Sequence, residues 1–168
     1  SRAANVVGKI ISRNHKYRDE FVIIGAHFDH LGYGGPGSGS LKPDTNAVHN
    51  GANDNASGTA GLLELAHKLQ TNRKLLKRSI LFIAFDAEEK GLLGSKYFVQ
   101  NPTINIKNVS AMINMDMIGK MRDSTVIIGG VGTSPVFEPI LDSLSIDTGL
   151  KFEYDKAGYG PSDHASFY

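Results

Sequence analysis

The sequence predicts an α/β domain with three layers, α/β/α, around a mostly parallel central sheet. Two observations support this prediction. Short apolar runs bounded by turn signals recur along the chain, and several are apolar at nearly every position, which is typical of strands covered on both faces. Helical patterns lie between these runs, and strands that alternate with helices form parallel sheets. We expect a single domain over residues 1–168, because a chain of this length buries roughly 70% of the surface it exposes when unfolded.

The expected strands, in chain order, are residues 6–11, 21–26, 80–85, 111–115 and 126–128, with a weaker run near 150–154. The expected helices are residues 56–70, 92–99 and 136–144. The first of these helices places Leu62, Leu65 and Leu69 on one face. Residues 32–40 open a turn-rich stretch that reaches Asn55. We expect a long surface loop there rather than a linker, because too few residues precede it to form a domain.

Composition excludes several classes of protein. The chain has 18 Lys and Arg against 17 Asp and Glu, which argues against nucleic-acid binding through bulk charge and against a polybasic membrane tether. The longest apolar run is six residues, 80–85, far too short to span a membrane. The sequence has no cysteine, which excludes thiol nucleophiles, cysteine-based zinc fingers and iron–sulfur clusters.

Polar side chains follow three of the expected strands at the point where each strand ends. Open α/β sheets hold their ligand sites at this edge. The segments that follow the strands are His27-Phe28-Asp29-His30, Asp86-Ala87-Glu88-Glu89 and the single residue Asp116. A further acid, Asp54, precedes the first long helix, and Ser162-Asp163-His164 lies near the end of the chain.

Each of these residues also has a purely structural interpretation. Asp54 is a possible helix cap, His27 and His164 are possible structural histidines, and Asp116 is a possible member of a buried ion pair. Together, however, they would form a dense group of carboxylates, which cannot all stay ionised without a counter-charge. A pair of divalent cations supplies that charge. Imidazole and carboxylate donors without sulfur suit zinc, with manganese or cobalt as possible substitutes, and two adjacent metals need a bridging carboxylate.

Residue spacing suggests roles within this group. In an extended segment His27 and Asp29 share a face, whereas His30 points away. Asp29 is therefore placed to hold the far ring nitrogen of a metal-bound His27. Glu88 and Glu89 are adjacent and point in different directions, so one can bind metal while the other faces the metal-bound water as a general base. We expect His49, near Asp54, to lie on the rim of the site rather than to act as a ligand.

Five segments carry a family resemblance. They are GAHFDH (25–30), NGANDNASG (50–58), FDAEEKGLLGS (85–95), NMDMIG (114–119) and GPSDHASF (160–167). Together they resemble the signature blocks of the co-catalytic di-zinc exopeptidases of clan MH, and in particular bacterial leucine-aminopeptidase-type enzymes. The blocks occur in the family's order across nearly the whole chain. The resemblance implies the zinc-exopeptidase (phosphorylase/hydrolase-like) fold.

The resemblance implies two Zn2+ ions per chain. His27 and Asp116 would bind one zinc, and Glu89 and His164 the other. Asp54 would bridge the two ions. The family's cis peptide bond would fall here between Asp54 and Asn55.

The remaining implied roles concern catalysis. Glu88 would be the general base, and Asp29 would hold His27 in place. Met117 and Tyr159 would line the pocket for the first side chain of the substrate. The implied activity is a metallo-aminopeptidase, which hydrolyses the N-terminal bond of peptides with a free N-terminus through a hydroxide bound by both zinc ions. A glutaminyl cyclase-like acyltransferase and a non-catalytic scaffold on the same fold are the alternatives.

The resemblance further implies a secreted or periplasmic location. Neither a nucleic-acid partner nor a membrane span is expected. In the family the chain continues past the second histidine block, so we expect residues 1–168 to lack a final strand and helix.

Overall fold

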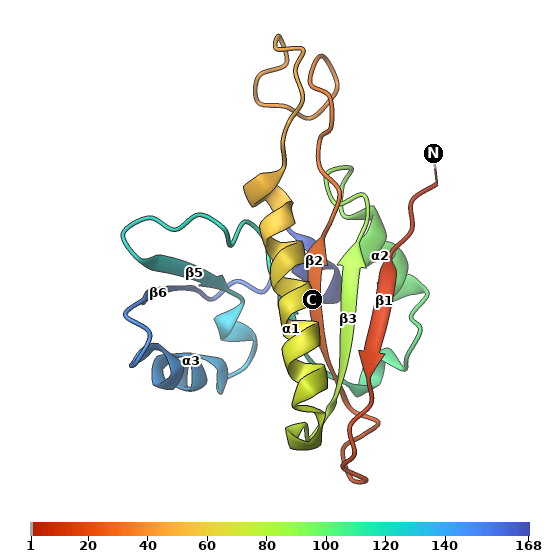
Figure 1. Ribbon diagram of the computed structural model, residues 1–168, viewed down its shortest axis with the longest axis vertical. Coiled ribbons are helices and arrows are strands. Elements are labelled where there is room, and N and C mark those ends of the chain that lie inside the picture. Colours follow the sequence, from red (N-terminus) through yellow and green to blue (C-terminus); the bar gives the residue numbers. More distant parts are fainter. Residues whose placement is uncertain (1) are drawn as a thin grey trace.

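The computed structural model describes residues 2–168 and contains a four-stranded sheet in the order β1-β3-β2-β4 (Figure 1). Its strands are β1 (Val6–Ile10), β2 (Phe21–His27), β3 (Ser79–Phe85) and β4 (Val109–Asn114). β2 runs parallel to both β3 and β4, and β1 pairs antiparallel with β3 at the edge. The mostly parallel sheet that the sequence predicts is confirmed.

Helices cover both faces of this sheet. The helix α1 (Ser57–Thr71) packs on one face, where Ile24, Leu62 and Phe82 belong to a buried cluster. The helix α2 (Leu93–Gln100) and the short 3-10 helix Asp163–Phe167 pack on the other face. The core there is formed by Ile23, Leu81, Ile83, Phe85 and Phe98. The three predicted layers are therefore present.

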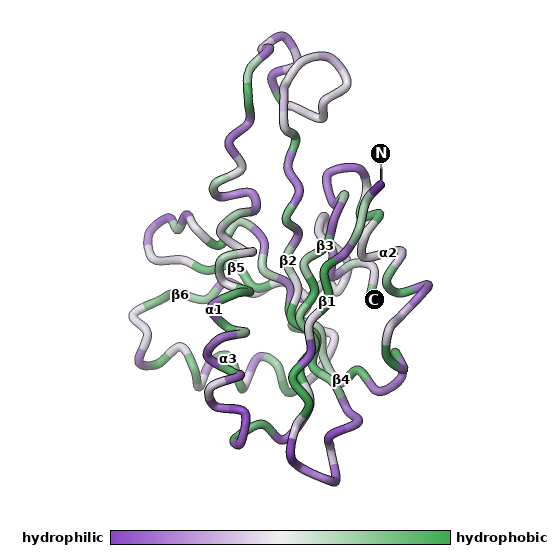
Figure 2. The backbone as a smooth tube through the Cα atoms, turned by 45° about the vertical axis from the view of Figure 1, so that its right-hand side comes forward, coloured by the Kyte–Doolittle hydropathy of each residue, from purple (hydrophilic) through white to green (hydrophobic). Residues whose placement is uncertain are grey.

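The alternation of side chains in β2 and β3 explains why these strands are apolar almost throughout. Ile23 lies in the core under α2, whereas its neighbour Ile24 lies in the core under α1. Both faces of the strand are buried, so each position favours an apolar residue. Figure 2 shows this hydrophobic stretch at the centre of the molecule and the hydrophilic turn at residues 12–20 below it.

Two of the expected strands form a separate sheet. β5 (Thr125–Gly129) and β6 (Lys151–Asp155) pair in parallel and are connected through α3 (Phe137–Ser145). This unit lies to one side of the main sheet (Figure 1). In β6 partly buried and exposed residues alternate, which fits a strand covered on one face only. All three expected helices are present, and each begins one residue later than expected.

A long loop, residues 31–51, projects beyond the carboxyl end of β2 (Figure 1). Tyr33 and Val48 form an isolated antiparallel bridge within it. The N–H groups of Gly34 and His49 donate to the carbonyls of Ala47 and Gly32 at 2.7 and 2.8 Å. The surface loop predicted from the turn-rich sequence is thus confirmed. No helix within residues 2–168 is both long enough and apolar enough to cross a lipid bilayer.

Strand register brings three strand ends to one level. His27 lies opposite Phe85 on β3, and Gly25 lies opposite Asn114 on β4. Just past the strands, the N–H of Met115 donates to the carbonyl of Gly25 at 2.9 Å. The residues that follow β2, β3 and β4 therefore emerge together at the carboxyl edge of the sheet.

Replacement of Gly58 by alanine tests how closely α1 approaches this edge. A Cβ at Gly58 would collide with Oδ1 of Asn55 and with the carbonyl oxygen of Met115. Alanine favours a helix by about 1 kcal/mol over glycine, but we expect Gly58→Ala to lower the free energy of unfolding by about 1–3 kcal/mol through overpacking. Denaturant unfolding measures this change. Gly129→Ala, where a Cβ meets nothing within 4 Å, is the control. A Gly58→Ala chain as stable as the wild type would contradict the expectation.

Candidate metal centre

His27 is the last residue of β2, and its side chain is only 1% exposed. Its Nδ1 lies 3.1 Å from the backbone carbonyl oxygen of Asp29, which can only accept a hydrogen bond. This contact assigns the proton to Nδ1 and leaves Nε2 available as a ligand atom. Nε2 lies 3.3 Å from Oδ1 of Asp54 and 3.4 Å from Oδ1 of Asp116. The strand thus delivers a buried imidazole between two carboxylates.

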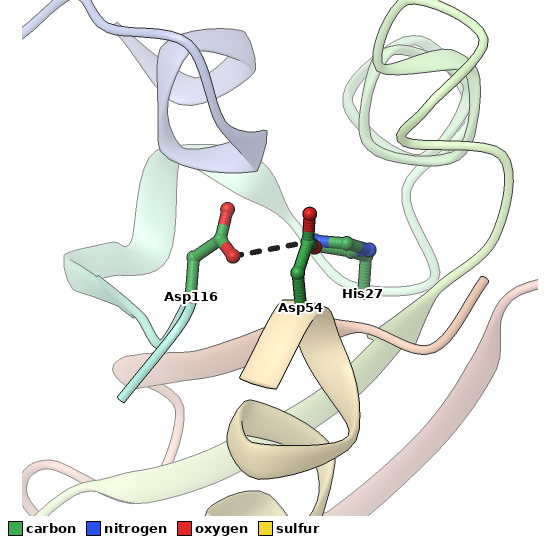
Figure 3. Close-up of side chains that lie close together, drawn as sticks. All are labelled: His27, Asp54 and Asp116. Atoms are coloured by element: carbon green, nitrogen blue, oxygen red, sulfur yellow. Dashed lines mark ion pairs between the residues drawn. The ribbon is translucent and has the colours of Figure 1, made fainter. Parts of the chain in front are cut away.

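Figure 3 shows Asp116, Asp54 and His27 close together, with a carboxylate oxygen of Asp116 directed at the imidazole. Asp116 follows β4, whereas Asp54 belongs to the segment Ala52–Ala56 that leads into α1. The peptide bond between Asp54 and Asn55 is cis, as the resemblance implies. The carboxylate and imidazole atoms of His27, Asp54 and Asp116 all lie within 4.8 Å of one another. We call these three residues the first group.

A second group shares Asp54 with the first. Nδ1 of His30 lies 2.7 Å from Oε1 of Glu89 and 3.8 Å from Oδ2 of Asp54. Ligand atoms of His30, Asp54 and Glu89 again lie within 4.8 Å of one another. Asp54 therefore turns Oδ1 toward the first group and Oδ2 toward the second.

The position of His30 corrects the sequence-based expectation that it points away. That expectation extended the strand alternation past His27, but β2 ends at His27 and the backbone no longer follows a strand path. His30 instead reaches Glu89 from the loop after β2. A signal was present in the sequence, since His30 lies in the same polar segment as His27, but the direction of its side chain depends on where the strand ends.

Asp29 also acts differently from the expectation. It holds His27 through its backbone carbonyl, whereas its carboxylate oxygen Oδ1 is 3.7 Å from Nδ1, too long for a hydrogen bond. The carboxylate instead accepts the backbone N–H groups of Glu88 and Glu89 at 3.0 and 3.3 Å. Asp29 thus links the segment after β2 to the segment after β3 and holds the backbone of Glu88 and Glu89 in place.

Asn55 supports the centre in a way that sequence reasoning missed. Its side chain is buried, and its Nδ2 donates to the carbonyl of Met115 at 2.9 Å. Its Oδ1 accepts the N–H of Gly58 at 2.9 Å and of Met117 at 3.2 Å. Asn55 therefore fastens the segment around Asp116 to the start of α1.

An open cleft of about 790 Å³ lies over the centre. Asp54, Glu88, Glu89 and Asp116 line it, together with Met117 and Tyr159, the two residues expected in a substrate pocket. His164 lies in the short helix Asp163–Phe167. Among residues 2–168, its ring does not join either group of ligand atoms within 4.8 Å, and neither does that of His49. His49 instead packs edge-on against His30, with ring centroids 6.1 Å apart.

Burial and crowding of charge shift the pKa values of Glu88 and His27 in the metal-free chain. Burial raises the pKa of Glu88 to about 7, and the nearby carboxylates of Asp163 and Asp116 add to this. For His27 burial opposes the charged form, but the carboxylate of Asp116, 3.4 Å from Nε2, outweighs it and raises the pKa to about 9. The imidazole of His27 is therefore protonated at pH 7, and its positive charge compensates part of the negative charge around it.

The donor atoms fit divalent metal. Oδ1 of Asp116 is buried and accepts no hydrogen bond from the residues described, so a cation at this point would satisfy it. Donors around a tetrahedral zinc, with bonds of about 2.0–2.2 Å, lie about 3.4 Å from one another. The distances of 3.3 and 3.4 Å from Nε2 of His27 to the two aspartates match this spacing. His27, Asp54 and Asp116 could therefore hold one ion, and Asp54 with Glu89 a second.

Comparison with known proteins identifies the family of this chain. The sequence profile of Peptidase family M28 matches residues 5–168. The chain belongs to peptidase family M28. It spans between 22% and 40% of the length of the curated relatives it matches. Leucine aminopeptidase 1 of Leptosphaeria maculans is 31% identical to it over 160 residues, which cover 88% of this chain and 39% of that protein.

Several solved structures share the fold of this chain. The zinc aminopeptidase BSAP from Bacillus subtilis is 29% identical with a TM-score of 0.69, over 97% of this chain and 36% of that one. A glutaminyl cyclase from an Acidobacteriales bacterium superposes with the same TM-score of 0.69 at 23% identity, over 97% of this chain and 54% of the cyclase. The latter likeness shows the fold alone.

Zinc binding to the metal-free chain is expected to release protons at pH 7. The pKa of His27 is about 9, so its ring carries two protons at pH 7 and must lose one before Nε2 can bind metal. Calorimetric titration with zinc in two buffers of different ionisation enthalpy measures the number of protons released. The same titration without protein is the control. A binding heat independent of the buffer would contradict this assignment.

Proposed function

We propose that this chain carries a two-zinc peptidase centre that removes the N-terminal residue of peptides. The observation that carries the proposal is the placement of Asp54, whose two carboxylate oxygens face two separate groups of donors. A carboxylate shared in this way is what a pair of adjacent metals requires. Membership in family M28, whose relatives include zinc aminopeptidases, supports the same function.

Zinc bound at this centre would polarise the scissile carbonyl and make an attacking water more acidic. The chain itself supplies the proton acceptor. Glu88 lines the cleft beside Asp116, and its carboxylate is of the kind that acts as a general base. Oε1 or Oε2 of Glu88 would accept the proton of the water and later return it to the leaving amine.

The open cleft supports a peptide substrate. Met117 and Tyr159 present exposed side chains at its wall, where they could contact the first side chain of the peptide. The carboxylates of the floor would attract a free N-terminal ammonium group, which N-blocked peptides lack. A single catalytic domain over residues 1–168, and a secreted or periplasmic location, are part of the same proposal.

The proposed activity is tested by release of nitroaniline from leucine nitroanilide. We expect release by the chain, loss of release with a chelator, and recovery when zinc is restored. An acetylated leucine nitroanilide is the control, because it lacks the free amine. Absence of zinc-dependent release would contradict the proposal for this chain. Cyclisation of an N-terminal glutamine peptide would favour the cyclase alternative instead.

The variant Glu88→Gln is expected to keep its zinc content and to lose turnover by about 10²–10⁴-fold, because glutamine cannot accept the proton. Metal analysis and turnover of the same preparation measure both properties. Glu64→Gln makes the same chemical change at an exposed position of α1 and is the control. Near-normal turnover of Glu88→Gln would remove Glu88 from the role of base.

A further inference from the structure

We propose that His30 is a positioning residue of the metal centre. It donates a hydrogen bond from Nδ1 to Oε1 of Glu89 and so leaves Oε2 of this glutamate turned toward the second ion. The inference rests on the proposed two-zinc function and adds no ligand to it, because Glu89 and His164 remain the ligands that the family resemblance implies. It gives a role to a histidine that the resemblance leaves without one.

The contact between His30 and Glu89 has the length of a hydrogen bond. Nδ1 lies 2.7 Å from Oε1, at the short end of the range for N–H···O bonds. An ionised carboxylate can only accept, so the proton of this bond lies on Nδ1. Oδ2 of Asp54 is 3.8 Å from Nδ1, too far for a second hydrogen bond. The N–H group of His30 is therefore directed at Glu89.

This bond orients a side chain that has few other restraints. The backbone N–H of Glu89 donates to Oδ2 of Asp29 at 3.3 Å, which places the main chain but leaves the side-chain torsions free. Within residues 2–168, His30 is the one side chain that donates to the carboxylate of Glu89. A mobile glutamate loses rotamer entropy when it binds an ion, so a partner that holds it beforehand strengthens binding.

The loop of residues 31–51 holds the ring of His30 in this direction. A Cβ at Gly51 would lie 3.1 Å from Cβ and Cδ2 of His30, so the backbone of Gly51 packs directly against the side chain. The ring of His49 lies edge-on, with its centroid 6.1 Å away. A Cβ at Gly34 would lie 3.1 Å from Nε2 of His49, so the loop also packs against this second ring. The loop thus reaches the second metal site through His49 and His30.

A similar arrangement supports the histidine of the first group. Nδ1 of His27 lies 3.1 Å from the backbone carbonyl oxygen of Asp29, and this contact fixes the ring whose Nε2 faces Asp54 and Asp116. In the second group the histidine is the supporting residue and the carboxylate is the ligand. Carboxylates that bind metal are usually hydrogen-bonded by a neighbour in this way.

Two variants of similar size separate the hydrogen bond of His30 from the packing of its ring. In His30→Asn the amide nitrogen branches from Cγ where Nδ1 of histidine does, so the variant keeps a donor toward Glu89. In His30→Leu a methyl group takes this place and donates nothing. Titration with zinc measures the affinity for each ion, and His67→Ala on the exposed face of α1 is the control.

We expect His30→Leu to raise the dissociation constant of one zinc ion by about 10–100-fold, the usual cost of losing the hydrogen-bond partner of a metal ligand. The affinity for the other ion should not change, and His30→Asn should bind both ions nearly as the wild type does. An equal loss in the two variants would show that the ring rather than the donated proton is required, which overturns the inference. Unchanged affinities in His30→Leu would overturn it as well.

A second measurement uses the wild-type chain and does not depend on the folding of variants. The chain is labelled with nitrogen isotope in its histidines and loaded with a spin-active cadmium isotope in place of zinc. We expect Nδ1 of His30 to keep its proton in the loaded chain and neither ring nitrogen of His30 to show coupling to cadmium. Nε2 of His27 should show this coupling and is the internal reference. A His30 nitrogen coupled to cadmium would overturn the positioning role.

The two experiments separate this inference from the proposed function. A wild-type chain that binds two zinc ions, with unchanged affinities in His30→Leu, would overturn the role of His30 and leave the two-zinc function intact. A wild-type chain that binds no zinc would overturn both.

Discussion

The parallel pairing of β2 with β3 and β4 determines where the polar residues of this protein meet. In parallel strands the carboxyl ends lie at the same edge, and the pairing of His27 with Phe85 and of Gly25 with Asn114 brings the three ends level. The packing at this register is tight at Gly25, where a Cβ would lie only 2.6 Å from the ring of Phe85, so only glycine fits at this position. A shift by one residue would also turn His27 toward the opposite face of the sheet.

The carboxylates clustered at this edge of the sheet repel one another, and the protein's own positive and hydrogen-bond-donating groups offset only part of this repulsion. The raised pKa values of Glu88 and Asp163, about 7 and about 6, both arise chiefly from burial. His27 supplies one positive charge, and the backbone N–H groups that Asp29 accepts supply partial charges. Oδ1 of Asp116 and both oxygens of Asp163 still accept no hydrogen bond from the residues described. Unsatisfied carboxylates of this kind are costly in a protein of ordinary stability unless a cation binds.

The sequence predicts the layers of this fold well because β2 and β3 are apolar at almost every position, and strands of this kind are typical of a sheet covered by helices on both faces. It predicts the assembly of His27, Asp54 and Asp116 because strand ends and helix starts are readable from turn signals. It does not predict the direction of His30, since that depends on β2 ending at His27. Nor does it reveal that β5 and β6 form their own sheet, because pairing partners are chosen by packing among segments far apart in the sequence. The place of His164 relative to Glu89 is likewise a matter of tertiary packing.

The wide spacing of the donors along the chain has a thermodynamic consequence. His27, Asp54, Glu89 and Asp116 belong to four segments that come together only when the main sheet is complete. An unfolded chain offers no such cluster, so an ion bound there acts as a cross-link that exists only in the native state. At a free ion concentration about 100 times the dissociation constant, one such ion adds about 2.7 kcal/mol to the free energy of unfolding. The supply of metal in its surroundings would thus change the fraction of folded chains and, with it, the resistance of this chain to proteolysis.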